Sequence, residues 1–199
     1  MLDNATILLI RHAEKPGDSN IDRIEDGTFL IPAGRQRALA YIAYFQSLQI
    51  TDVNDDKVTA YPFKLDALFA ARDSKASHRP RLTLEPVAVA AGLDINCDYA
   101  ETEFEKIIKE MGEIPERRIL VCWHHEKILA LADQLLAFAG HPGKLPAASR
   151  WPTTWPGKVF GWTLQIRLDA NRKLMVPWTK CTNQKMMFDD KVEPPADAA

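Results

Sequence analysis

Apolar runs that stop abruptly at basic or imidazole residues constrain the fold of this chain more than any other feature. Three runs end in this way: residues 7–10 at Arg11-His12, residues 65–71 at a basic turn that includes Arg79, and residues 118–123 at His124-His125. Each run has the length and composition of a buried strand. The later two lead directly into helical patterns, and alternation of strands and helices predicts a largely parallel sheet with helices on both faces.

The remaining patterns complete an α/β architecture in a single domain. Amphipathic helical spacing marks four segments: 32–45, 80–91, 104–111 and 128–138. Residues 159–168 alternate like a strand, and we expect residues 173–178 to pair with them as a hairpin across 169–171. The prediction is a three-layer α/β/α domain over residues 1–191 with a mostly parallel central sheet and an antiparallel edge. Pro- and Ala-rich residues 192–199 are predicted to be a disordered tail.

Composition excludes several classes of function. A net charge of −2 over 199 residues supplies no basic field, so we expect neither nucleic acid nor a membrane surface as a partner. The three cysteines lack CxxC spacing, and their odd count favours a reducing compartment. The N-terminal residues do not have the pattern of a secretory signal, and no apolar segment approaches the length of a membrane span. We therefore expect a cytoplasmic protein.

The basic and imidazole residues at the strand ends suit a phosphoryl group. The carboxyl ends of parallel strands lie on one edge of a sheet, so residues more than a hundred positions apart can meet there. Arginine pairs bidentately with phosphate oxygens, and a neutral imidazole can attack phosphorus and carry the phosphoryl group covalently. A second, protonated imidazole can donate to the equatorial oxygens of the transition state.

With these residues in place, the chain resembles the histidine phosphatase superfamily, which is phosphoglycerate mutase-like in fold. The resemblance rests on four segments in the order of the family: LLIRHAEK (8–15), LIPAGRQRA (30–38), RPRLTLEP (79–86) and LVCWHHEKI (120–128). Some positions depart from the usual pattern of the family. Ala13 stands in place of the commonest glycine, and Trp123 and Glu126 replace small residues.

The resemblance implies roles for individual residues. His12 corresponds to the phosphorylated nucleophile, and Arg11 to the phosphate-binding arginine before it. The family's second arginine lies four residues before a helical threonine, which indicates Arg79. Its second histidine lies three residues before an aliphatic residue, which favours His125, with His124 as the alternative.

The proton donor is the least defined role. The family often places a Glu or Asp between the second arginine and the second histidine, and its usual spacing from Asp98 leads to Glu103, with Glu101 as the alternative. Both side chains have an equally simple explanation, in which they only charge the first turn of the helix at Phe104. The sequence does not decide between these readings.

We expect no metal and no cofactor. The segment 124–126 (HHE) has Leu129 where an HExxH zinc motif would need its second histidine, and residues 140–144 lack the spacing of a P-loop. The function predicted from the sequence is a metal-independent phosphomonoester phosphatase acting through a phosphohistidine on His12. The alternatives are a phosphoglycerate mutase-type phosphotransferase and a non-catalytic binder of phosphorylated ligands. The partner is a small phosphorylated substrate or a phosphoprotein, enclosed by loops 16–30 and 147–157, where Trp151 and Trp155 either line the pocket or pack the sheet edge.

Overall fold

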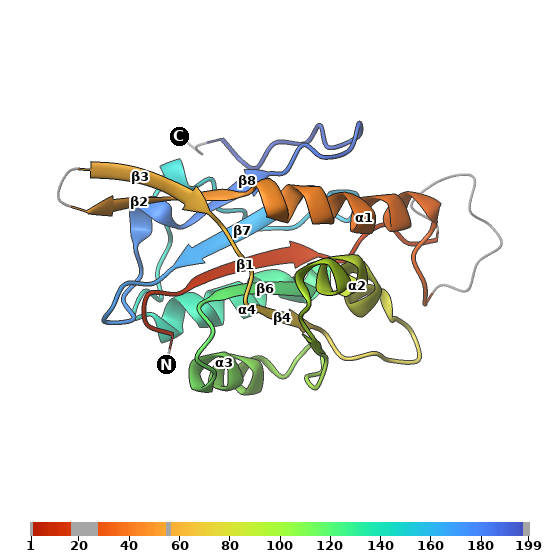
Figure 1. Ribbon diagram of the computed structural model, residues 1–199, viewed down its shortest axis with the longest axis horizontal. Coiled ribbons are helices and arrows are strands. Elements are labelled where there is room, and N and C mark those ends of the chain that lie inside the picture. The colour runs from red at the N-terminus through yellow and green to blue at the C-terminus, as the bar shows by residue number, and fades with distance from the viewer. Residues whose placement is uncertain (1, 17–27, 55–56, 197–199) are drawn as a thin grey trace.

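A six-stranded mixed sheet forms the centre of the computed structural model, which describes residues 2–16, 28–54 and 57–196. In sheet order the strands are β5 (Ile95–Asn96), β4 (Ala67–Ala70), β6 (Arg118–Trp123), β1 (Thr6–Arg11), β7 (Trp162–Arg167) and β8 (Lys180–Asn183). The first four run parallel, and β7 and β8 complete the sheet antiparallel to their neighbours (Figure 1). The predicted mostly parallel sheet with an antiparallel edge is confirmed.

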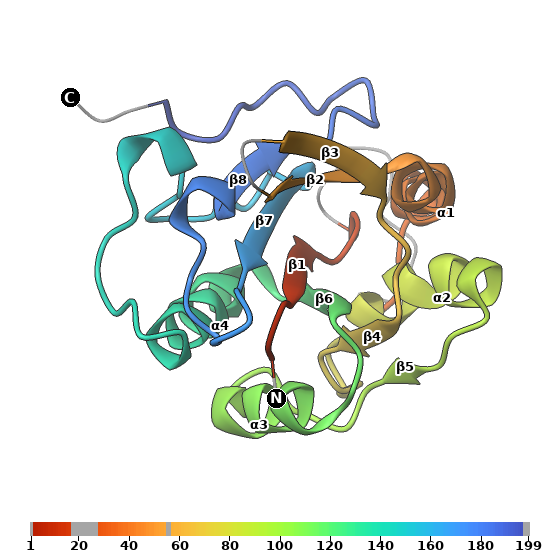
Figure 2. The ribbon, with the colours of Figure 1, turned by 60° about the vertical axis from the view of Figure 1, so that its left-hand side comes forward.

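Four helices cover the two faces of this sheet. They are α1 (Pro32–Ser47), α2 (Arg79–Ala91), α3 (Phe104–Glu113) and α4 (His125–Phe138). Helices α1 and α2 pack on one face and α3 and α4 on the other, which gives the expected α/β/α layers (Figure 2). All four occupy the segments in which the sequence predicts helices, with differences of up to three residues at their ends.

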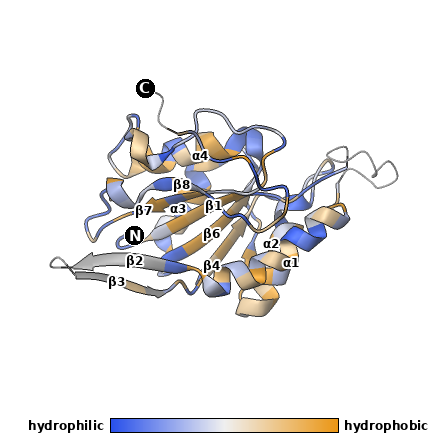
Figure 3. Ribbon diagram, turned by 90° about the horizontal axis from the view of Figure 1, so that it is seen from above, coloured by the Kyte–Doolittle hydropathy of each residue, from blue (hydrophilic) through white to orange (hydrophobic). Residues whose placement is uncertain are grey.

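The central strand β1 is buried on both faces. Ile7 and Leu9 belong to the core beneath α3 and α4, whereas Leu8 and Ile10 belong to the core beneath α1 and α2. Side chains alternate between the faces of a strand, and burying each of these contributes about 1.5–3 kcal/mol. Figure 3 shows the resulting hydrophobic strands between more polar helices. His12 therefore follows directly after a strand that is anchored in both cores.

The antiparallel edge differs in detail from its prediction. The partner of β7 is β8, whereas the predicted strand 173–178 contains only an isolated bridge from Leu174 to Leu168 and a 3₁₀ turn over Val176–Trp178. Pro177 lies in that turn and cannot donate to a strand ladder. The chain resumes pairing two residues after the turn, at Lys180.

Two further parts of the structure were not predicted from sequence patterns. A small separate sheet of β2 (Gln49–Asn54) and β3 (Lys57–Pro62) occupies a polar region with no predicted strand. In the predicted tail, which is described up to residue 196, the carbonyl of Val192 accepts a hydrogen bond from Trp162 Nε1. Among the described residues, no helix is long and apolar enough to cross a membrane.

Candidate active site

The carboxyl ends of β1, β4 and β6 lie side by side. Cys122 of β6 is in register with Ile10 on one side and Ala70 on the other, so the residues after the three strands share one edge. A cavity of about 450 Å³ opens at this edge. Its basic and imidazole lining comprises His12, Lys15, Arg72, Arg79, His124 and His125, and its carboxylates are Asp73, Glu101 and Glu126.

His12 lies at the buried end of this cavity as a neutral imidazole. Its Nδ1 is 2.7 Å from the carbonyl oxygen of Ala13, and only a protonated Nδ1 can donate to that oxygen. The lone pair of the neutral ring is then on Nε2. Burial, aided by the nearby charge of Arg11, lowers the pKa of His12 well below its usual value. The ring is therefore suited to act as a nucleophile at neutral pH.

His124 is the histidine that the structure brings against His12. The two rings meet edge to face with centroids 5.3 Å apart, and His124 Nε2 lies 3.8 Å from Glu101 Oε2. Burial, with the positive charge of Arg79 beside it, lowers the pKa of His124 to about 4. His125 also lines the cavity, as the first residue of α4. The two candidates from the sequence thus occupy one cavity, and His124 is the one in contact with His12.

Arg79 is fixed at the start of α2 by a side-chain bridge to β1. The hydroxyl of Thr83 donates to the carbonyl of Arg79 at 2.8 Å and accepts the backbone N–H of Ala13 at 2.9 Å. The threonine four residues after the arginine therefore joins the turn after His12 to the first turn of α2. Both α2 and α4 begin at the cavity, and helix N-termini favour bound anions.

Arg11, which the resemblance assigns to phosphate binding, contacts backbone carbonyl oxygens in the structure. Its side chain is fully buried, and Nη1 donates to the carbonyl oxygens of Gly157 at 2.6 Å and Val159 at 3.1 Å. The guanidinium carbon lies 3.7 Å from the centre of the Phe160 ring. Arg11 is not among the described residues that line the cavity. The structure places it where it holds the segment 157–160 against β1.

The two candidate proton donors also separate. Glu103 precedes α3 and does not line the cavity. Its carboxylate accepts a hydrogen bond from the N–H of Ala100 at 2.8 Å and forms an ion pair with Lys106 at 2.6 Å. The hydrogen bond from Lys106 is the main cause of a pKa for Glu103 below its usual value. Glu101 lines the cavity, and its carbonyl accepts the indole N–H of Trp123 at 3.0 Å.

Other candidates from the sequence lie elsewhere. Trp155 packs in the core against Trp162, with ring centroids 5.6 Å apart, and Trp151 lines a separate cavity. Of the predicted loop 16–30, residues 17–27 lie outside the described part of the chain. The sequence did not single out Arg72, which lines the cavity, because an arginine in a polar turn has no distinguishing pattern.

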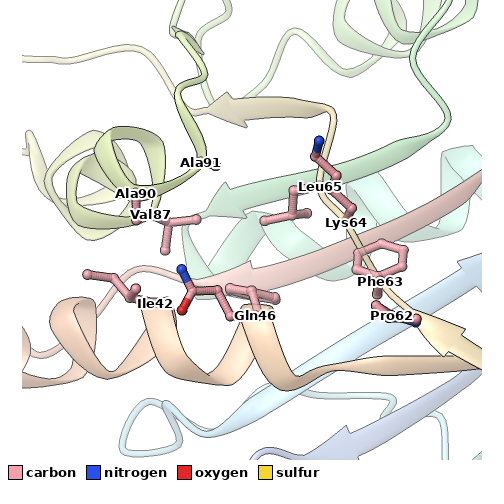
Figure 4. A pocket seen from close by; sticks show the side chains of 10 residues that line it. Ile42, Gln46, Pro62, Phe63, Lys64, Leu65, Val87, Ala90 and Ala91 are labelled. Atoms are coloured by element: carbon pink, nitrogen blue, oxygen red, sulfur yellow. The ribbon is translucent and has the colours of Figure 1, made fainter.

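The cavity at His12 differs from a second one of about 370 Å³ between α1, α2 and the connection from β3 to β4 (Figure 4). That cavity is lined mainly by apolar side chains such as Ile42, Phe63, Leu65 and Val87, with Lys64 as its charged residue. Within the described ranges, no cluster of three or more histidine, cysteine or carboxylate side chains could hold a metal ion.

No protein-family model matches the chain, and no curated protein matches it in sequence. Solved structures match it in fold. A protein from Escherichia coli str. K-12 described as a candidate alpha-ribazole-5'-P phosphatase is 14% identical, with 89% of this chain and 97% of that chain covered at a TM-score of 0.54. The protein histidine phosphatase SixA in complex with tungstate is 14% identical, with 88% and 96% covered at a TM-score of 0.51.

These likenesses show the fold. The chain has the phosphoglycerate mutase-like α/β fold seen in solved members of the histidine phosphatase superfamily, as the resemblance in the sequence implied.

Proposed function

We propose that the protein is a phosphomonoester phosphatase that acts through a phosphohistidine on His12. The observation that carries the proposal is the contact between two neutral imidazoles, His12 and His124, in a cavity that Arg79 also lines. The fold shared with phosphatases supports the same reading. A neutral nucleophile beside a guanidinium and two helix N-termini is a combination that suits transfer of a phosphoryl group.

In the first step, the lone pair on His12 Nε2 attacks phosphorus and the bond from phosphorus to the leaving oxygen breaks. Arg79, with the imidazoles of His124 and His125, binds the phosphoryl oxygens as charge spreads over them. The carboxyl group of Glu101, which lies on the cavity wall, gives a proton to the leaving oxygen.

In the second step, water attacks phosphorus and the bond to Nε2 breaks. Glu101, now a carboxylate, accepts a proton from that water and is ready for the next cycle. Before each attack, the hydrogen bond from Nδ1 to the Ala13 carbonyl keeps the reacting lone pair on Nε2.

Two roles from the sequence remain predictions in this scheme. Direct contact of Arg11 with the phosphoryl group would require its guanidinium to leave the carbonyl oxygens of Gly157 and Val159. Proton donation by Glu103 would require its carboxylate to leave Lys106. We propose instead that Arg11 supports segment 157–160 and that Glu101 is the acid.

Turnover of p-nitrophenyl phosphate and of phosphorylated metabolites by the parent protein and a His12→Ala variant tests the proposal. We expect the variant to lose activity by a factor of about 10³ or more, since the nucleophile is removed. A His141→Ala variant serves as the control, because His141 lines a separate cavity beside Trp151 and should keep the parent rate.

The products distinguish the alternatives. Release of inorganic phosphate supports a phosphatase, whereas movement of phosphate between the oxygens of a sugar acid would indicate a mutase. Saturable binding of phosphorylated compounds without any turnover would indicate a binding protein. Equal activity of the parent and His12→Ala proteins would refute the proposed mechanism.

A further inference from the structure

We propose that Arg37 is a positioning residue for His12. Arg37 belongs to a buried chain of charged groups that fixes the orientation of the peptide after Ala13, and the carbonyl of this peptide fixes the tautomer of His12. The inference rests on the proposed function, since it assigns the residues that prepare His12 for attack. It concerns a cluster on the far side of the turn after β1, made of Glu14, Arg37 and Asp190, which we call the buried triad.

The peptide group between Ala13 and Glu14 is the point at which the triad acts on His12. Its carbonyl, that of Ala13, accepts the Nδ1 proton of His12 at 2.7 Å. The N–H of Ala13 on the preceding peptide donates to Thr83, and the carbonyl of Glu14 on the following one accepts the N–H of Ile31 at 3.2 Å. A rotation of this peptide would remove the acceptor that keeps the proton on Nδ1.

The side chain of Glu14 extends from this peptide into the protein interior. It is 5% exposed, and its Oε1 accepts Arg37 Nε at 2.8 Å and lies 2.7 Å from Nη2. A buried carboxylate needs a paired cation, so the position of Glu14 follows the position of Arg37.

Arg37 is held in turn by the C-terminal segment. Nη1 and Nη2 donate to the two carboxylate oxygens of Asp190 at 3.0 and 2.9 Å, the forked geometry that orients a guanidinium. Arg37 is 1% exposed, and its two carboxylate partners raise its pKa despite burial, so it stays charged.

The carboxylate of Asp190 is held by backbone groups and packs closely against Gly161. Its Oδ2 accepts the N–H groups of Met186 and Met187, and a Cβ on Gly161 would lie 2.5 Å from its carboxylate carbon. Phe160 connects Arg37 with Arg11, the residue before His12. The guanidinium carbons of Arg11 and Arg37 lie 3.7 and 5.9 Å from the centre of its ring. Residues at the end of the chain thus reach the turn that carries the nucleophile.

The triad predicts an effect on catalysis that a purely stabilising ion pair would not have. We expect Glu14→Gln and Arg37→Met to lower kcat by about 10- to 100-fold with KM changed less than about twofold, because a misplaced nucleophile slows chemistry more than binding. Arg37→Lys keeps the charge but not the fork, and should fall between the parent and Arg37→Met.

The decisive readout is the tautomer of His12, measured by ¹H–¹⁵N NMR of the imidazole nitrogens. The parent should show the Nδ1–H form alone, whereas Arg37→Met and Glu14→Gln should show a mixture with the Nε2–H form. If Arg37→Met does not fold, Glu14→Gln decides, since it preserves the shape of the side chain. This readout does not need turnover, so an inactive parent would refute the proposed function and leave the inference to be judged on the tautomer.

Asp66→Asn is the matched control. Asp66 also joins a carboxylate to an arginine and to backbone N–H groups, at Arg117 and Arg118, but it lies at the opposite end of the sheet. It should lower thermal stability without changing kcat or the His12 tautomer. If Glu14→Gln and Asp66→Asn behave alike, with loss of stability and a parental tautomer and kcat, the inference is overturned.

Discussion

The turn after β1 separates two groups of ionisable residues with opposite arrangements. On the cavity side, His12, His124 and Arg79 gather around open space, and carboxylates such as Glu101 stand at its wall. On the other side, Arg37 is enclosed between two carboxylates in the buried triad. The difference teaches that ionisable side chains can line an open cavity at one place, whereas at another they pair with one another in the interior.

Arg11 illustrates the division. It is adjacent in sequence to His12, yet its guanidinium contacts backbone carbonyls and Phe160 and does not line the cavity. Arg11 is the last residue of β1 and His12 follows the strand, so these two neighbours in sequence have side chains in different surroundings. Contact of Arg11 with a bound phosphoryl group therefore stays a prediction.

The largest expected effect comes from breaking the cavity side. His124→Ala should lower kcat for p-nitrophenyl phosphate by about 10²- to 10³-fold, because it removes the imidazole in contact with His12. His125→Ala is the matched variant one residue along, and we expect a loss of less than about tenfold. A larger loss for His125→Ala would return the role of second histidine to the residue that the sequence favoured.

The packing of α1 against the turn after β1 can be disrupted without changing a charged residue. In Gly34→Ala, the new Cβ would lie 2.5 Å from the carbonyl oxygen of Glu14, so the helix and the turn must separate. We expect destabilisation of about 1–3 kcal/mol by chemical denaturation, although alanine favours a helix by about 1 kcal/mol. Gly112→Ala in α3 meets no atom within 4 Å and should leave the protein as stable as the parent or more so. Equal stability of the two variants would contradict the close packing at Gly34.

Substitution of Glu101 or Glu103 by glutamine tests which of the two carboxyl groups donates the proton. Glu101→Gln should lower kcat for an alkyl phosphate by about 10- to 100-fold, and less for p-nitrophenyl phosphate, whose leaving group needs no proton. Glu103→Gln should leave both rates within about twofold of the parent, because its carboxylate is bound to Lys106 and Ala100. The reverse pattern would show that Glu103 is the acid.

The smallest effect concerns stability against pH. The pKa of His124 is about 4 in the folded protein and 6.5 in a free chain, so unfolding takes up a proton between these values. The folded state therefore loses stability as pH falls from 6.5, by at most about 1.4 kcal/mol per pH unit from this residue. Urea unfolding at pH 6.5 and 5.5 should show a smaller decrease in His124→Asn than in the parent. An identical decrease would mean that His124 titrates normally.

Sequence reasoning succeeded where a regular pattern fixes position. The continuous apolar runs of β1 and β6 and the alternation of strands with helices predicted a parallel sheet, and the structure buries both strands on both faces. The resemblance pointed to Arg79 because a threonine lies four residues after it, and the hydroxyl of Thr83 donates to the carbonyl of Arg79. The resemblance favoured His125 over His124, but the sequence could not show which ring contacts His12, because one residue at a helix start turns the side chain by about 100°. The ion pair from Arg37 to Asp190 spans 153 residues, and neither residue stands out from a solvated charge in the sequence.

The central claim is that His12 carries the phosphoryl group, and rapid quenching during turnover tests it most directly. The parent, mixed with a phosphomonoester and quenched in alkali to preserve a phosphoramidate, should yield a phosphorylated peptide mapped by mass spectrometry to His12, with none in His12→Ala. Turnover with no phosphate on His12, or with phosphate on another residue, would contradict the account.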